Sequence, residues 1–215
     1  MTNIPAGAIL PAVSFGDVLL YSLIVTGRVT VLLVFGVLAV VVLAHLLFLD
    51  RRAGSPAHRD PRSFTGAALS FLLAFVVPLC VKFGWGSVGP WVPRPLAATL
   101  AGLGTLACFT AVTFMGWAVL VLGRAAHVLA RVDRGGRLVR EPPFSLVRHP
   151  IYFGLGLLFA GSALAAVNWI AAAVAVAWWP VALQRARIED QLLRKAFGAE
   201  FEDYARKVPG IWPRL

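Results

Sequence analysis

Long apolar runs, separated by short basic clusters, constrain what this chain can fold into more than any other feature. The stretch VTVLLVFGVLAVVVLAHLLFL, residues 29–49, contains no acidic residue, lysine or arginine, and a helix of about 20 apolar residues crosses the hydrocarbon core of a bilayer. Hydrophobic residues make up 59% of the 215-residue sequence and charged residues only 14%, against about 45–50% and about 25% in soluble domains. The sequence therefore predicts an all-α polytopic integral membrane protein.

The lengths of these runs predict about five transmembrane helices. The predicted spans are residues 29–49, 64–84 and 96–122, followed by two spans within residues 151–183. The last run is too long for one crossing, and its polar break, VNW, predicts a tight helical hairpin that turns at Asn168. Residues 4–28 either extend the first span or form a separate interfacial helix, and the sequence leaves both open.

Basic side chains orient the predicted spans in the membrane. They follow the first, third and fifth spans, whereas the other connections hold few of them. These residues are Arg51, Arg52, Arg59 and Arg62; Arg124, Arg131, Arg134, Arg137, Arg140 and Arg148; and Arg185, Arg187, Arg194, Lys195, Arg206, Lys207 and Arg214. Because basic residues concentrate in cytoplasmic loops, we expect the N-terminus outside and the C-terminus in the cytoplasm, in a bacterial inner (plasma) membrane. The net charge of +10 then meets anionic headgroups, and no nucleic acid partner is expected.

The sequence RHPIYFG, residues 148–154, stands at the mouth of the predicted hairpin. Proline is favoured in the first helical turn, where its missing N–H would have no partner anyway, so the fourth helix is expected to begin at about His149. Free N–H groups at such a terminus favour an anionic group, which Arg148 and His149 would flank, while Tyr152 offers a hydroxyl one turn further in. The alternative is that Arg148 anchors the helix at the headgroups and that His149 and Tyr152 are ordinary interfacial residues.

Arg185 and Glu189 are four residues apart, just beyond the apolar end of the hairpin. Residues at this spacing share one helix face. The two side chains therefore form either an exposed ion pair or part of a site, because ionisable groups kept at membrane depth tend to be functional. No histidine or cysteine has a partner at metal-ligand spacing, so no metal site is predicted. Cys80 and Cys108 lie inside apolar runs and are expected to be small buried hydrophobic residues.

Two longer motifs carry a resemblance to a known family. The stretch LVREPPFSLVRHPIYFG, residues 138–154, is followed one hairpin later by RARIEDQLLRKAFGAEFEDYARKVP, residues 185–209. In this order the motifs resemble the isoprenylcysteine carboxyl methyltransferase family and its bacterial and archaeal relatives, within a wider group that contains phospholipid N-methyltransferases. The chain departs from the family pattern at Phe144, where a tyrosine is common, and at Asp190, the second member of an acidic pair. The first three spans match only in general character.

The resemblance implies an integral membrane enzyme that transfers the methyl group of S-adenosyl-L-methionine and releases S-adenosyl-L-homocysteine. The residues implied to bind the cofactor are Gly136, Arg137, Leu138, Val139, Phe144, Arg148, His149, Pro150, Tyr152 and Glu189. Glu189, on a tail helix that closes the cytoplasmic cofactor pocket, and Arg185, facing the methyl acceptor, are the implied catalytic residues. The cofactor's carboxylate, ammonium and sulfonium groups suit a helix N-terminus, an acidic side chain and an aromatic environment, respectively.

The expected acceptor is an isoprenoid or other lipid-like molecule whose carboxylate is methylated at the cytoplasmic face. A carboxylate is already ionised at neutral pH and needs no general base, and Arg185 would orient it by a bidentate contact. A sterol-reductase-type enzyme that uses NADPH is an alternative, because Arg134, Arg137 and Arg140 could converge on the cofactor's phosphates. A non-catalytic scaffold or transporter is a second alternative. The sequence chooses neither the acceptor's chemistry nor the oligomeric state.

This interpretation divides the chain into two regions. Residues 1–122 are the N-terminal membrane bundle of three spans, and residues 123–215 are the catalytic region. The catalytic region begins with a connection to residue 149, longer than the few residues that usually join helices in a bundle, and such lengths are more often functional than idle. The hairpin follows at residues 150–183, and interfacial helices end the region, the first of them capped by Gly198.

Overall fold

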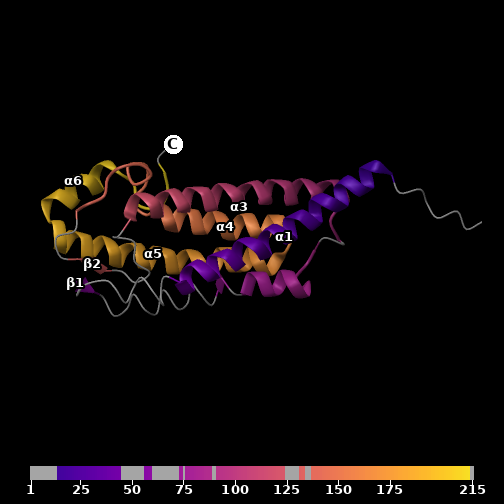
Figure 1. The fold of residues 1–215 in the computed structure, drawn as a ribbon, viewed down its shortest axis with the longest axis horizontal. Helices are drawn as coiled ribbons and strands as arrows, with labels where there is room; N and C mark the ends of the chain where they lie inside the picture. The colour runs from indigo at the N-terminus through magenta and orange to yellow at the C-terminus, as the bar shows by residue number, and fades with distance from the viewer. Residues whose placement is uncertain are drawn as a thin grey trace, which may run out of the picture.

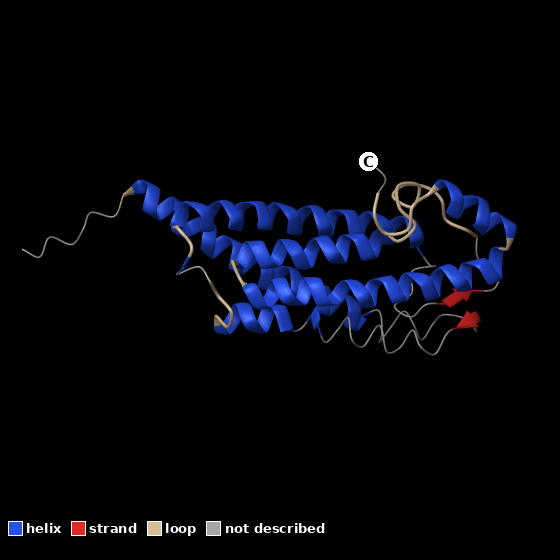
Figure 2. Cartoon of the chain, turned by 180° about the vertical axis from the view of Figure 1, so that it is seen from behind, coloured by secondary structure: helices blue, strands red, loops and turns tan. Residues whose placement is uncertain are grey.

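The computed structural model describes residues 14–44, 56–59, 73–74, 76–88, 91–123, 131–133 and 137–213. The named elements are α1 Phe15–Ala44, β1 Pro56–Arg59, α3 Arg94–Leu122, β2 Arg131–Asp133, α4 Pro150–Ala166, α5 Trp169–Phe197 and α6 Ala199–Lys207, and residues 76–83 are also helical. The long helices lie side by side in an elongated bundle (Figure 1), and the view from behind in Figure 2 shows the same arrangement. The body of the protein is therefore helical, as predicted. The short antiparallel β1–β2 pair was not predicted.

Two of the described helices are long and apolar enough to cross a membrane. These are Phe15–Gly36 within α1, and Arg94–Leu122, which is α3. α4 is apolar but shorter. α1 is one continuous helix, so the described part of residues 4–28 extends the first predicted span. Residues 45–49 and the first part of the predicted second span, residues 64–72, lie outside the described residues, whereas residues 76–83 of that span are helical.

The predicted hairpin turn at Asn168 is confirmed. Val167 ends α4 in the left-handed conformation, with φ of 47°. Asn168 is the N-cap of α5, and its side-chain oxygen accepts a hydrogen bond from the Ala171 N–H at 3.0 Å. Capping of this kind satisfies an N–H group that has no partner within the helix, so Val167 ends the first helix and Asn168 starts the second.

α5 is longer than the sequence analysis expected. The hairpin was expected to end at residue 183 and to be followed by a separate interfacial helix, but α5 continues without a break to Phe197. The residues after 183 are good helix formers, and no glycine or proline interrupts them before Gly198. Gly198 is the C-cap, as predicted, with φ of 52°. The continuous helix fixes Arg185 and Glu189 rigidly with respect to the apolar half of α5.

Close contact between α3 and α4 forms the centre of the bundle. A Cβ atom on Gly104 of α3 would lie 2.2 Å from the Ala165 backbone nitrogen and 2.5 Å from the Gly161 carbonyl oxygen of α4. No side chain fits there, so glycine lets the two backbones approach as small residues do in membrane helix pairs. This contact fixes where α4 begins relative to α3.

The connections divide between the two ends of the bundle. At one end Asp17 of α1 pairs with Arg94 of α3 at 3.5 Å, and the Val88 N–H donates to the Val167 carbonyl at 3.0 Å beside the α4–α5 turn. The other end holds the end of α3, the start of α4, and α6 (Figure 1). Basic residues of the third connection and the tail lie at this second end: Arg148 contacts Ala205 and Val208, Arg140 pairs with Glu200, Arg194 pairs with Glu202, and Arg206 and Lys207 are in the last turn of α6. Loops predicted to share one side of the membrane thus share one end of the fold.

Candidate active site

The start of α4 lies at the basic end of the bundle. Pro150 is the first residue of α4 and His149 is its N-cap, as the RHPIYFG motif predicted. The His149 carbonyl accepts a hydrogen bond from the Phe153 N–H at 3.1 Å. The His149 side chain is 4% exposed, so the imidazole is enclosed by protein at the entrance of an apolar helix.

Arg148 joins three separate segments. Its guanidinium forms a two-point contact with Asp190 of α5, with Nη2–Oδ2 at 2.8 Å and Nε–Oδ1 at 3.4 Å. Its Nη1 donates to the carbonyl oxygens of Ala205, at 3.1 Å, and Val208, at 2.6 Å. A planar guanidinium suits such a two-point contact with a carboxylate. Arg148 therefore ties the start of α4 to α5 and to the end of α6.

Residues 208–213, the C-terminal segment, run along the entrance of α4. The Arg148 backbone N–H donates to the Pro209 carbonyl at 2.8 Å, and the His149 N–H donates to the Gly210 carbonyl at 3.1 Å. These bonds satisfy backbone groups immediately before the helix, where an unpaired buried group would be costly. The C-terminal segment thus covers the site from outside α4.

His149 lies between two carboxylates. Its Nε2 is 2.9 Å from Asp190 Oδ1 and its Nδ1 is 3.4 Å from Glu189 Oε2. An imidazole can donate from both nitrogens only when protonated. Burial favours the neutral ring, but the hydrogen bonds and charges of Asp190 and Glu189 outweigh it and raise the pKa of His149 to about 9. The same imidazolium and Arg148 lower the pKa of Asp190 against the opposing effect of its own burial.

Glu189 also connects His149 to a tyrosine and a buried arginine. The Tyr152 hydroxyl donates to Glu189 Oε1 and accepts from Arg185 Nε at 3.0 Å. Arg185 Nη2 lies 3.9 Å from Glu189 Oε1, and its guanidinium carbon lies 5.7 Å from the centre of the Tyr152 ring. The His149 and Tyr152 rings are stacked, with centroids 5.7 Å apart.

Six side chains thus form one connected group, called here the ion cluster. Its members are Arg148, His149, Tyr152, Arg185, Glu189 and Asp190. With His149 protonated, three cations face two carboxylates, so the cluster offers cationic groups to a ligand carboxylate and acidic groups to a ligand cation. Arg185 is 6% exposed, which excludes the alternative that it forms a solvated surface pair with Glu189.

The other residues implied to bind the cofactor lie around Tyr204 of α6. Phe144 is buried, and its carbonyl accepts from the Tyr204 hydroxyl at 2.6 Å. Leu138 packs beside Tyr204 in a small hydrophobic group, and Val139 follows it along the chain, partly exposed. Arg137 is exposed and pairs with Glu141 at 2.9 Å. Gly136 lies outside the described residues.

Sequence reasoning assigned no role to Asp190 or Tyr204. Asp190 contacts both Arg148 and His149, and Tyr204 fixes the loop that leads to them. A signal for Asp190 was present, because two adjacent buried cations need more than one carboxylate to compensate them. Tyr204 belongs to the tail motif that carries the family resemblance, but no local pattern specifies its partner, a backbone carbonyl 60 positions away.

The arginines that supported a reductase do not converge in the described structure. Arg137 pairs with Glu141 at 2.9 Å, whereas Arg140 pairs with Glu200 at 2.8 Å and lies over the Tyr204 ring. Arg134 is outside the described residues. Two arginines held in separate, solvent-exposed ion pairs do not form the phosphate site that NADPH requires.

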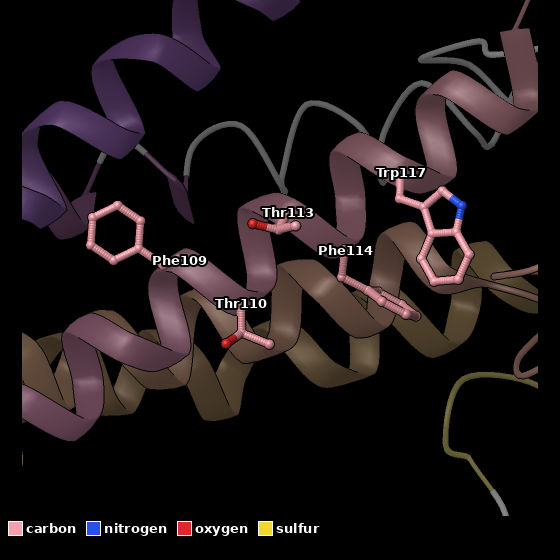
Figure 3. A pocket seen from close by; sticks show the side chains of 5 residues that line it. All are labelled: Phe109, Thr110, Thr113, Phe114 and Trp117. Atoms are coloured by element: carbon pink, nitrogen blue, oxygen red, sulfur yellow. The ribbon is translucent and has the colours of Figure 1, made fainter.

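A shallow groove on the outer face of α3 is separate from the ion cluster. It is lined by Phe109, Thr110, Thr113, Phe114 and Trp117 (Figure 3). None of these residues belongs to the predicted site. The groove is mostly aromatic, which suits a surface that meets lipid.

The protonated state of His149 predicts a pH-dependent stability. Its pKa is raised from 6.5 to about 9, so its stabilisation is complete below about pH 6.5 and is lost as pH rises through about 9, a difference on the order of 3 kcal/mol. The detergent-solubilised protein is expected to melt at progressively lower temperature between pH 7 and pH 10. His149→Gln should melt lower at pH 6 and show a flatter profile across that range. Parallel profiles for the two proteins would contradict a protonated His149.

Residues 99–200 match the phospholipid methyltransferase family, a range that includes every member of the ion cluster. The nickel-cobalt-cadmium resistance protein NccN of Alcaligenes xylosoxydans xylosoxydans is 35% identical over 48% of this chain and 54% of its own length. Among the described residues, no three histidine, cysteine or acidic side chains are grouped so as to hold a metal ion.

Two relatives have names that state a methyl transfer. Protein-S-isoprenylcysteine O-methyltransferase B of Arabidopsis thaliana is 32% identical over 45% of this chain and 50% of its own length. Methanethiol S-methyltransferase 2 of Bradyrhizobium diazoefficiens is 32% identical over 67% of this chain and 58% of its own length. The chain thus spans little more than half the length of the curated relatives it matches. Residues 99–200 thus match the phospholipid methyltransferase family, and the chain is similar to an isoprenylcysteine methyltransferase, which confirms the resemblance found in its motifs.

Proposed function

We propose that the protein is an integral membrane methyltransferase that uses S-adenosyl-L-methionine to methylate a carboxylate on a lipophilic acceptor. The observation that carries this proposal is the buried ion cluster, which lies within the family segment where two apolar helices meet the basic end of the bundle. A water-soluble, charged cofactor and a membrane-bound acceptor can meet at such a boundary. The relatives named as methyltransferases support the reaction class.

The side chains present fit the charges of S-adenosyl-L-methionine. Glu189 is partly exposed, at 28% of its side chain, and a carboxylate suits an ammonium group. Arg148 and His149 at the start of α4 suit the amino-acid carboxylate. The Tyr152 ring stacks on His149 and lies beside Arg185, and an aromatic face suits a sulfonium cation. These side chains together therefore suit a ligand that carries one carboxylate and two positive charges.

When bound, S-adenosyl-L-methionine supplies the electrophilic methyl group, whose S–C bond breaks as the new O–C bond to the acceptor forms. The chain's own task is to position the two reactants, and holding them at near-attack distance accounts for much of the rate. Arg185 is itself held by the Tyr152 hydroxyl at 3.0 Å, so its guanidinium is preorganised to orient the acceptor carboxylate. No proton moves, because the carboxylate is ionised beforehand.

We also propose the membrane arrangement that the basic residues favour: five spans, the N-terminus outside, and the active site at the cytoplasmic face of a bacterial inner membrane. The two apolar helices α1 and α3 support insertion. The gathering of described basic residues at one end of the bundle supports the orientation. The acceptor would enter sideways between helices and leave its polar head at Arg185.

Calorimetric titration of the purified protein tests cofactor use. S-adenosyl-L-methionine and S-adenosyl-L-homocysteine are expected to bind, and NADPH is not. His149→Ala and Glu189→Ala should each weaken binding by at least about tenfold, because each removes a charged group from the site. Asp203→Asn is the matched control, because Asp203 is an exposed acidic residue on α6 whose partner is Arg206.

Absence of adenosyl-ligand binding to folded wild-type protein would contradict the proposal. Binding of NADPH in its place would favour the reductase. If Asp203→Asn weakened ligand binding as much as the His149 and Glu189 variants do, the loss would be a general consequence of removing a charge. The ion cluster would then not be the cofactor site.

A further inference from the structure

Trp178 contains an unsatisfied polar group in the interior of the bundle. Its side chain is 1% exposed, and its indole Nε1 has no hydrogen-bond partner in the described structure. Leaving a buried donor unpaired is costly, and such groups call for a specific explanation. An N–H that has no partner within the folded chain can be satisfied by a ligand group that reaches it.

The position of Trp178 places this donor next to the proposed acceptor site. Trp178 and Arg185 are seven positions apart on α5 and therefore lie on the same face, two turns apart. Long side chains on a helix lean toward its N-terminus, so the Arg185 side chain extends toward Trp178. The Tyr152 ring lies between them: its centroid is 6.4 Å from that of Trp178, and its hydroxyl accepts from Arg185.

The surroundings of Trp178 are apolar on the other sides. Its ring lies against Phe159 and Trp179, with centroid distances of 5.5 Å and 5.4 Å. Glu189 and Asp190 lie beyond Arg185 along α5, away from Trp178. The indole therefore lies on the membrane side of Tyr152, where a lipophilic molecule would enter, whereas the carboxylates that suit the cofactor lie on the other side.

We propose that the Trp178 indole N–H donates a hydrogen bond to the polar head of the methyl acceptor and positions it against Arg185. This inference rests on the proposed methyltransferase function and narrows the substrate class. The acceptor has at least two hydrogen-bond-accepting groups at the end of an apolar chain, one at Arg185 and one within reach of Trp178. Trp178 is a positioning residue, because it holds the acceptor without taking part in bond making.

Nuclear magnetic resonance of protein labelled with ¹⁵N at the indole nitrogens tests the contact directly. The sequence contains seven tryptophans, and Trp178→Phe identifies the resonance of Trp178 by its disappearance. The probe is N-acetyl-S-farnesyl-L-cysteine, added to protein saturated with S-adenosyl-L-homocysteine. The Trp178 N–H resonance is expected to move downfield on addition of the probe, because a new hydrogen bond deshields the proton.

Steady-state methylation of the same probe gives an independent readout. Trp178→Phe should raise the KM for the probe by about tenfold, the loss of one hydrogen bond, and should leave the affinity for S-adenosyl-L-homocysteine unchanged. Replacement of Trp178 by 3-benzothienylalanine retains the ring size but has no N–H, so it should raise KM equally without creating a cavity. Trp169→Phe, at the start of the same helix, is the control for losing an indole.

The outcomes separate this inference from the proposed function. Failure of the wild-type protein to bind S-adenosyl-L-homocysteine or to methylate the probe would contradict the proposed cofactor or acceptor class. Normal probe binding with a stationary Trp178 resonance would contradict the Trp178 inference alone. So would an unchanged KM for the benzothienylalanine variant, because a purely structural role needs the ring and not the N–H.

Discussion

Replacing Arg148 with glutamine is expected to destabilise the protein by about 3–5 kcal/mol, as breaking a buried ion pair does when it leaves the partner charge uncompensated. Arg148 and Asp190 are only 15% and 20% exposed, and the same guanidinium holds the carbonyls of Ala205 and Val208. The loss should appear as a lower melting temperature in detergent. Limited proteolysis should also cut the C-terminal segment sooner, because that segment loses contacts to the start of α4.

Arg206→Gln provides the matched control for this prediction. Arg206 also pairs with an aspartate, Asp203, but both side chains are exposed, at 71% and 58%. Exposed pairs contribute about 0–1 kcal/mol, so Arg206→Gln should melt close to the wild-type temperature. Equal stability of the Arg148 and Arg206 variants would contradict the role of Arg148 in joining the three segments.

Replacing Arg185 with alanine is expected to reduce kcat/KM for a prenylcysteine acceptor by roughly 10²- to 10³-fold, the usual cost of removing one partner of a buried, hydrogen-bonded charge pair. The reason is that Arg185 is fixed by Tyr152 at 3.0 Å and orients the acceptor carboxylate in the proposed reaction. Arg185→Lys keeps the charge but loses the planar fork, so it should recover only part of the activity. The measurement is initial-rate kinetics with the acceptor varied at saturating cofactor.

Arg187→Ala is the control, because Arg187 lies two positions further along α5 and is exposed. It should keep the wild-type kcat/KM. Calorimetry on the Arg185 variant should show affinity for S-adenosyl-L-homocysteine close to that of the wild type. A parallel loss of cofactor affinity would instead place Arg185 in the cofactor site. Full activity of Arg185→Ala would show that Arg185 has no role in the reaction.

Helix boundaries could be predicted where one residue has a strong local effect. Pro150 starts α4 because it needs no N–H partner, and Asn168 starts α5 because its side chain caps the helix. Gly198 ends α5 with a positive φ that glycine adopts at no cost. The length of α5 could not be predicted from hydropathy, because loss of apolar character marks the edge of the membrane and does not mark the end of a helix.

The composition of the ion cluster was partly visible in the sequence. The RHPIYFG motif and the Arg185–Glu189 spacing identified residues that the fold brings together. The contact of His149 with Asp190 joins positions 41 residues apart, and no local pattern specifies it. Trp178 was not identified either, because a tryptophan in an apolar run is expected in a hydrophobic core, and the missing partner of its N–H is a property of the folded packing.

Transfer of a radiolabelled methyl group in lipid nanodiscs tests directly whether the protein methylates a carboxylate. The purified protein is incubated with S-adenosyl-L-methionine labelled in the methyl group and with N-acetyl-S-farnesyl-L-cysteine, and the product is extracted into organic solvent and treated with alkali. Label is expected in the organic phase, and alkali is expected to release it as volatile methanol, as a methyl ester requires. Arg185→Ala is expected to lose that label. Alkali-stable label would show methylation of a thiol or amine in place of a carboxylate, and no labelled product from folded protein would contradict the methyltransferase account itself.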